Sequence, residues 1–97
     1  MSSEQVHEYV AECFWPDVRD LDLQELDERV ARVAAELEGG GEQIRYLGSL
    51  LMRSDEVVLC LFQGSERAIR TVAARAEVPF ERIVETARSP WPKVVNP

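Results

Sequence analysis

The 97-residue chain is long enough for one domain with a modest core, and its 45% hydrophobic and 30% charged residues exclude a disordered protein. No apolar run approaches the ~20 residues of a membrane span, so we expect no membrane partner. The net charge of −7 is unevenly distributed, because the stretch 1–42 has twelve acidic side chains against three arginines and the rest of the chain is slightly basic. Nucleic-acid binding needs a clustered basic surface, so this distribution argues against nucleic acid as a partner.

The N-terminus and the cysteines both indicate a cytoplasmic protein. The opening "MSSEQVHEYV" lacks the basic segment and apolar core of a signal peptide, which predicts a cytoplasmic location. Cys13 and Cys60 show no C-x-x-C spacing. In a reducing compartment we expect them to be two buried small hydrophobic residues.

A strand followed by a helix is predicted at the start of the chain. Residues 6–15 are rich in aromatic and β-branched side chains and are stopped by Pro16, which favours a strand. Asp22 and Glu25 have the spacing of a capping box at the start of a helix, and glycines 39–41 end it. Apolar residues at helical spacing give this helix one buried stripe: Leu23, Leu26, Val30, Val33 and Leu37.

A hairpin, a second helix and a last strand follow. The hairpin strands are predicted near 43–52 and 56–62. Ser65 is placed to cap the second helix. The last strand covers 82–87, and the proline-rich residues 89–97 predict an extended C-terminal arm. The buried stripe of the second helix is Ala68, Ile69, Val72, Ala73 and Ala76.

The order β-α-β-β-α-β predicts an α+β ferredoxin-like sandwich, with both helices on one face of a four-stranded antiparallel sheet. Right-handed crossovers set the strand order 4-1-3-2. We expect a single domain over residues 1–97, with a core of about 6–88.

The third strand, "VVLCLF", is apolar on both sides, so the helix-free face of the sheet also needs a cover. A second copy of the chain is the expected cover. The sequence therefore predicts a homodimer, a dimeric α/β barrel-like assembly with a cavity between the two sheets.

Three segments, "YVAECFWP", "YLGSLLMRSDEVVLCLFQG" and "VPFERIVE", resemble the DUF4242 family of small bacterial proteins. The resemblance covers residues 9–85 and implies a ferredoxin-like fold and a homodimer. The family includes a nickel-binding member, so the resemblance implies nickel as a candidate cofactor. His7 is the single histidine and hence the candidate metal ligand, paired across a two-fold axis, with Glu8 or with another nearby carboxylate. The alternative is a strand histidine with no ligand role.

No sequence motif for catalysis is present, so candidates come from polar residues on apolar strands. By strand alternation, Glu12 shares a face with Val10 and Phe14. Apolar neighbours raise the pKa of a carboxyl group, which suits a general acid or base. The alternative is a structural ion pair between Glu12 and an arginine, for which Arg45 is the candidate.

The second strand adds candidate ligand-binding groups. Alternation puts Arg45 and Ser49 on one face with Leu47 and Leu51, where an arginine can bind a carboxylate or polarise a carbonyl. Gly48 is predicted to mark a bulge or a close backbone approach. Candidate pocket-lining residues, for which plain core is the alternative, are Tyr9, Trp15, Tyr46, Ser49, Cys60 and Phe62.

Three functions remain open from the sequence. The first is a homodimer that binds a small apolar ligand, or nickel, between its sheets. The second is a cofactor-independent enzyme of the cyclase, isomerase or monooxygenase type, acting on an apolar polyketide-like molecule through Glu12, His7 and Arg45. The third is a protein that binds a partner through its acidic helix.

Overall fold

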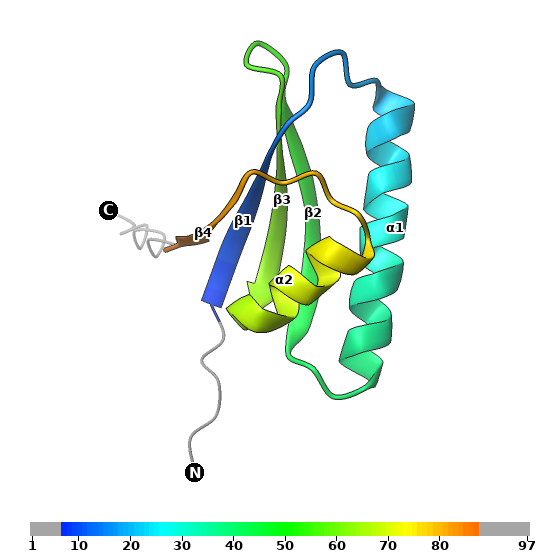
Figure 1. Cartoon of the computed structure of the whole chain (residues 1–97), viewed down its shortest axis with the longest axis vertical. Coiled ribbons are helices and arrows are strands. Elements are labelled where there is room, and N and C mark those ends of the chain that lie inside the picture. The colour runs from blue at the N-terminus through cyan, green and yellow to red at the C-terminus, as the bar shows by residue number, and fades with distance from the viewer. Residues whose placement is uncertain (1–6, 88–97) are drawn as a thin grey trace, which may run out of the picture.

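The computed structural model describes residues 7–87 of the chain. Its sheet is antiparallel with the strand order β2-β3-β1-β4, and α1 and α2 contact each other over one side of it (Figure 1). The predicted ferredoxin-like fold and strand order are therefore confirmed, while the predicted C-terminal arm lies outside the described residues. The elements are β1 (His7–Phe14), α1 (Asp20–Gly39), β2 (Ile44–Met52), β3 (Val57–Gly64), α2 (Glu66–Arg75) and β4 (Arg82–Thr86).

The hydrophobic core lies between the helices and one face of the sheet. Alternate residues of the two central strands, β1 and β3, point into it and are buried: Tyr9, Ala11, Cys13, Val58, Cys60 and Phe62. The helices supply the opposite wall with side chains at helical spacing, as predicted: Leu26, Val30, Val33, Ile69 and Val72. Neither described helix is both long enough and apolar enough to cross a membrane.

The starts of the two helices follow their capping residues. Ser65 caps α2 as predicted, because its hydroxyl accepts a hydrogen bond from the Ala68 backbone N–H at 3.2 Å. The predicted role of Asp22 as the N-cap of α1 is wrong. Asp22 is the third residue of the helix, and its carboxylate accepts from the Arg19 backbone N–H at 3.0 Å. In this position Asp22 satisfies the N–H of Arg19, the N-cap residue, so α1 begins earlier than its cap spacing suggested.

A β-bulge in β2 changes which side chains share a face. Tyr46 pairs with Phe62 and Gly48 pairs with Leu61, so Leu47 has no partner, and Gly48 adopts a φ of 112°. The prediction of a bulge at Gly48 is confirmed. Its consequence is a correction, because the extra residue reverses the alternation after Leu47. Arg45 and Leu47 precede that reversal, whereas Ser49 and Leu51 follow it and face the helices opposite Cys60 and Val58.

A close backbone contact joins the end of β3 to the start of β2. Gly64 has a φ of 154°, and a Cβ atom at this position would lie 2.3 Å from the Gln43 carbonyl oxygen. That oxygen belongs to the main chain, and the Ser65 N–H donates to it at 3.1 Å. The junction of the hairpin and α2 therefore requires glycine.

Replacing Gly64 with alanine is expected to lower the free energy of unfolding by roughly 2–4 kcal/mol, because the strained φ and the backbone clash add together. Urea denaturation measures the change. Gly39→Ala is the control, since that glycine lies inside α1 and a Cβ added there would have no atom within 4 Å, so it should be neutral or slightly stabilising. Equal stability of Gly64→Ala and the wild type would contradict this account of the junction.

Candidate functional site

The face of the sheet that points away from the helices, here called the open face, is the candidate site. Neither α1 nor α2 packs on it. The register places eight apolar side chains there, and all are at least partly exposed: Val10, Phe14, Leu50, Met52, Val57, Leu59, Leu61 and Val84. Its polar side chains are Glu8, Glu12, Arg45, Gln63, Arg82 and Thr86.

The apolar side chains of the open face form one continuous patch. Phe14 pairs with Val57, which pairs with Met52 in the next strand, and Leu50 pairs with Leu59. Phe14 is 54% exposed, Leu50 55% and Met52 43%. Cross-strand neighbours lie within side-chain contact distance, so these residues present a contiguous hydrophobic surface.

A bidentate ion pair lies inside this apolar surface. Glu12 and Arg82 are register partners on β1 and β4, and the Arg82 Nε and Nη2 atoms donate to the Glu12 carboxylate at 2.8 and 3.2 Å. These hydrogen bonds raise the pKa of Arg82. The prediction that Arg45 is the partner of Glu12 is wrong. It lies on the edge strand β2 opposite Gln63, whereas Glu12 lies opposite Leu59 on the other side of β3.

A pocket opens beside this ion pair because β4 is shorter than β1. The five residues of β4 pair only with Glu8–Glu12, so the last two residues of β1 have no partner on that side. The resulting pocket, here called the β1 notch, has a volume of about 480 Å³, within the ~300–1,000 Å³ range of ligand pockets. It is lined by Glu12, Cys13, Phe14, Val57, Glu81 and Arg82.

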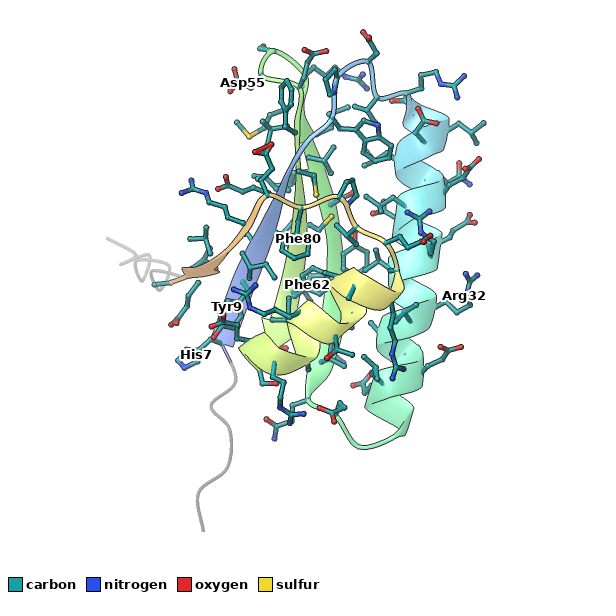
Figure 2. The ribbon with its side chains drawn as sticks, in the orientation of Figure 1. His7, Tyr9, Arg32, Asp55, Phe62 and Phe80 are labelled. Atoms are coloured by element: carbon teal, nitrogen blue, oxygen red, sulfur yellow. The ribbon has the colours of Figure 1, made fainter. Side chains whose placement is uncertain are left out.

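The residues predicted to line a pocket belong to the other side of the sheet. Phe62, Cys60 and Tyr9 are buried in the core, and Trp15 and Tyr46 pack against it. Tyr46 donates its hydroxyl to the Asp27 carboxylate at 2.5 Å, and burial raises the pKa of Tyr46. Figure 2 shows Tyr9 and Phe62 in the region of α2. None of the predicted pocket residues therefore reaches the open face. Their positions agree with the alternative, in which they belong to the core.

The two cysteines are free and fully buried, as predicted. Cys60 pairs with Ala11, two residues before Cys13, so the two thiols are diagonal neighbours under the helices. A hydrogen bond to Cys13, together with burial, raises the pKa of the Cys60 thiol. Full burial and a raised pKa are typical of a cysteine that packs in the core.

His7 lies at the start of β1, far from the hairpin tip marked by Asp55 (Figure 2). Its Nδ1 atom is 3.2 Å from a Glu85 carboxylate oxygen, and its ring lies edge-on to Tyr9 with centroids 6.4 Å apart. The strand alternation directs His7 and Glu12 to opposite sides of the sheet. The two residues proposed as acid and base in the enzyme hypothesis therefore do not converge on one site. Glu8, the suggested companion of His7, likewise belongs to the open face.

The fit of a nickel ion can be judged from the donor groups. Among residues 7–87, no three His, Cys, Asp or Glu side chains converge as a metal site. The chain has a single histidine, which contacts one carboxylate, whereas structural and catalytic transition-metal sites usually take three or four protein ligands. The described residues of one chain do not fit a nickel centre.

The fold and the site define a small ferredoxin-like α+β protein whose sheet is covered by helices on one side only. Comparison with known families gives a particular assignment. A family model described as "Nickel responsive protein SCO4226-like" matches residues 9–86, so the chain belongs to the SCO4226-like family. This assignment is compatible with the expected resemblance to a family that has a nickel-binding member, and the DUF4242 label itself remains a prediction.

Among solved structures, the crystal structure of SCO4226 from Streptomyces coelicolor A3(2) is similar to this chain. The TM-score is 0.70 at 16% sequence identity, over 86% of this chain and 99% of that chain. A likeness at this identity shows a shared fold. No curated protein matches the sequence.

A double-mutant cycle tests the assignment of the Glu12 partner. Glu12→Gln is expected to lower the melting temperature by roughly 2–4 °C, because the pair is partly exposed and screened by solvent. In the Arg82→Gln background the same substitution should have a smaller effect, since the partner is already absent. In the Arg45→Gln background it should keep its full effect. Coupling to Arg45 and none to Arg82 would contradict the pairing described above.

Proposed function

We propose that this chain is a small-molecule-binding protein that works as a homodimer, with the open faces of two copies packed against each other around a ligand cavity. The single observation that carries the proposal is the continuous apolar patch of the open face, which no described helix covers. Its neighbours on the helix side, such as Val58 and Phe62, are fully buried.

The energetic argument concerns the apolar side chains on the central strand β3. Burying a large apolar side chain is worth roughly 1.5–3 kcal/mol, and Val57, Leu59 and Leu61 all remain partly in water in a single chain. A small domain is stable by only ~5–15 kcal/mol in total. Because these three side chains are already partly buried, covering them together with the more exposed Phe14 and Leu50 gives only part of these amounts, which still favours association.

The shape of this surface supports a second copy of the chain as its cover. The patch spans β1, β2 and β3 and is mainly aliphatic, as in the core of a two-fold interface between sheets. Two twisted sheets packed face to face separate toward their corners, which leaves space for a ligand near the edges of the interface. The β1 notch, at one such edge, is where we place the ligand.

Leu59→Asp is expected to convert the protein from dimer to folded monomer, because a carboxylate would lie at the centre of the interface. Sedimentation equilibrium at micromolar concentration should give about twice the 11.0 kDa chain mass for the wild type and about 11.0 kDa for the variant.

The matched control for this substitution is Leu21→Asp. Leu21 is 57% exposed on α1, so the control introduces the same charge at an exposed leucine away from the open face and should sediment as a dimer. A wild type that is monomeric and well folded at this concentration would disprove the homodimer. Dissociation by Leu21→Asp but not by Leu59→Asp would move the interface to the helix side.

Nickel binding is the second candidate function, and the narrower DUF4242 resemblance supports it. The family to which the chain belongs is described as nickel responsive, and the single histidine of the chain contacts Glu85. Since no third His, Cys, Asp or Glu converges with this pair among residues 7–87, a bound ion would need further ligands, for example from solvent or from a second copy.

Calorimetric titration with nickel chloride tests this candidate. If His7 is a ligand, the wild type gives a saturable heat that His7→Ala abolishes. Asp55→Asn, which removes an exposed carboxylate from the hairpin tip at the far end of the molecule, should keep the heat. A wild type without saturable heat, or a His7→Ala variant that titrates like the wild type, would exclude His7 as a nickel ligand.

A further inference from the structure

The β1 notch combines an apolar wall with hydrogen-bond donors that face solvent, since the Arg82 side chain is 68% exposed, and that no described residue satisfies. Phe14 and Val57 give the notch its apolar surface, and Arg82 stands at its rim. A guanidinium group has five N–H donors, and two of those of Arg82 are engaged by Glu12. Three donors therefore remain, and no other hydrogen bond or ion pair involves Arg82 among residues 7–87.

The backbone at the end of β1 adds a further donor to the notch. The Glu12 carbonyl accepts from the Glu81 N–H at 2.7 Å, which shows that Glu12 directs its backbone groups toward the β4 side. The Trp15 N–H instead donates to the Glu56 carbonyl at 2.8 Å, on the β3 side. By antiparallel alternation the Phe14 N–H points toward the β4 side, where β4 does not reach.

The charges of the notch disfavour an anion, and its donors favour an accepting oxygen. An anion would lie beside the carboxylates of Glu12 and Glu81 and would have to compete with Glu12 for Arg82. A cation would be attracted by these carboxylates but offers no lone pair to the Arg82 N–H groups. A neutral group with an accepting oxygen avoids the repulsion and satisfies the unused donors.

We propose that the β1 notch binds the polar end of a neutral, apolar small molecule through a carbonyl-type oxygen, which accepts hydrogen bonds from Arg82. The inference rests on the proposed function, in which a second copy covers the open face and shields the notch from water. Arg82 thus takes the carbonyl-binding role that the sequence suggested for Arg45. The apolar body of the ligand lies against Phe14 and Val57.

Two dyes with one ring system provide the test. Nile red is neutral and carries a ring carbonyl, whereas Nile blue is cationic and carries a nitrogen group in place of that carbonyl. Fluorescence titration should show Nile red binding that depends on the Arg82 donors, whereas any binding of Nile blue, which the carboxylates attract, should not weaken when Arg82 is replaced. The anionic dye anilinonaphthalene sulfonate should bind more weakly than Nile red.

Variants of the Glu12–Arg82 ion pair test whether Nile red binding depends on Arg82. Arg82→Gln should weaken Nile red binding about tenfold, and the double variant Glu12→Gln/Arg82→Gln should do the same without leaving an unpaired carboxylate. Arg45→Gln removes a guanidinium from the far edge of the open face and should leave Nile red binding unchanged. Circular dichroism and sedimentation of each variant exclude loss of fold or of the dimer as the cause.

The outcomes separate this inference from the function on which it rests. A dimer that binds Nile red with the same affinity in the wild type and both Arg82 variants, or that loses affinity for Nile blue as much as for Nile red in those variants, overturns the inference and leaves the homodimer intact. A dimer that does not bind Nile red also overturns it. A monomeric wild type refutes the proposed function, and Arg82-dependent binding of Nile red to that monomer would still support the notch as the site.

Discussion

The apolar side chains that the central strands direct to both sides of the sheet are the constraint on which the rest of the structure depends. On one side, Cys13, Val58 and Phe62 are covered by two helices whose stripes of leucine, isoleucine and valine match them. On the other side, Val10, Leu59 and Leu61 have no such cover among the described residues. The helix side forms the core of one chain, and the open face is the surface that we propose for association and for ligands.

The elements and their order could be predicted from the sequence because they follow from local patterns. The helical spacing of Leu26, Val30 and Val33 requires an amphipathic helix, and the Ser65 hydroxyl marks where α2 begins. For six elements in this order, few compact folds have right-handed crossover connections. The start of α1 was misplaced because a helix can use the same carboxylate, Asp22, at either of two positions near its first turn.

The faces of β2 and the partner of Glu12 could not be predicted, since both depend on register. A bulge at Gly48 was expected, but alternation alone does not say which residue it leaves unpaired, and the faces after it reverse. Arg82 lies 70 residues from Glu12 in the sequence, and their contact follows from the pairing of the first and last strands. The strand order predicted that these two strands are neighbours. The position of each residue along them required the structure.

The central claim of the account is that the open face of one chain packs on the open face of another. Isotope-filtered nuclear Overhauser spectroscopy measures this contact most directly, on an equimolar mixture of chains labelled with carbon-13 at leucine methyl groups and unlabelled chains. We expect cross-peaks between chains from the methyl groups of Leu50, Leu59 and Leu61, and none from Leu26, which is buried within one chain. A spectrum without cross-peaks between chains from the three open-face leucines would contradict the account.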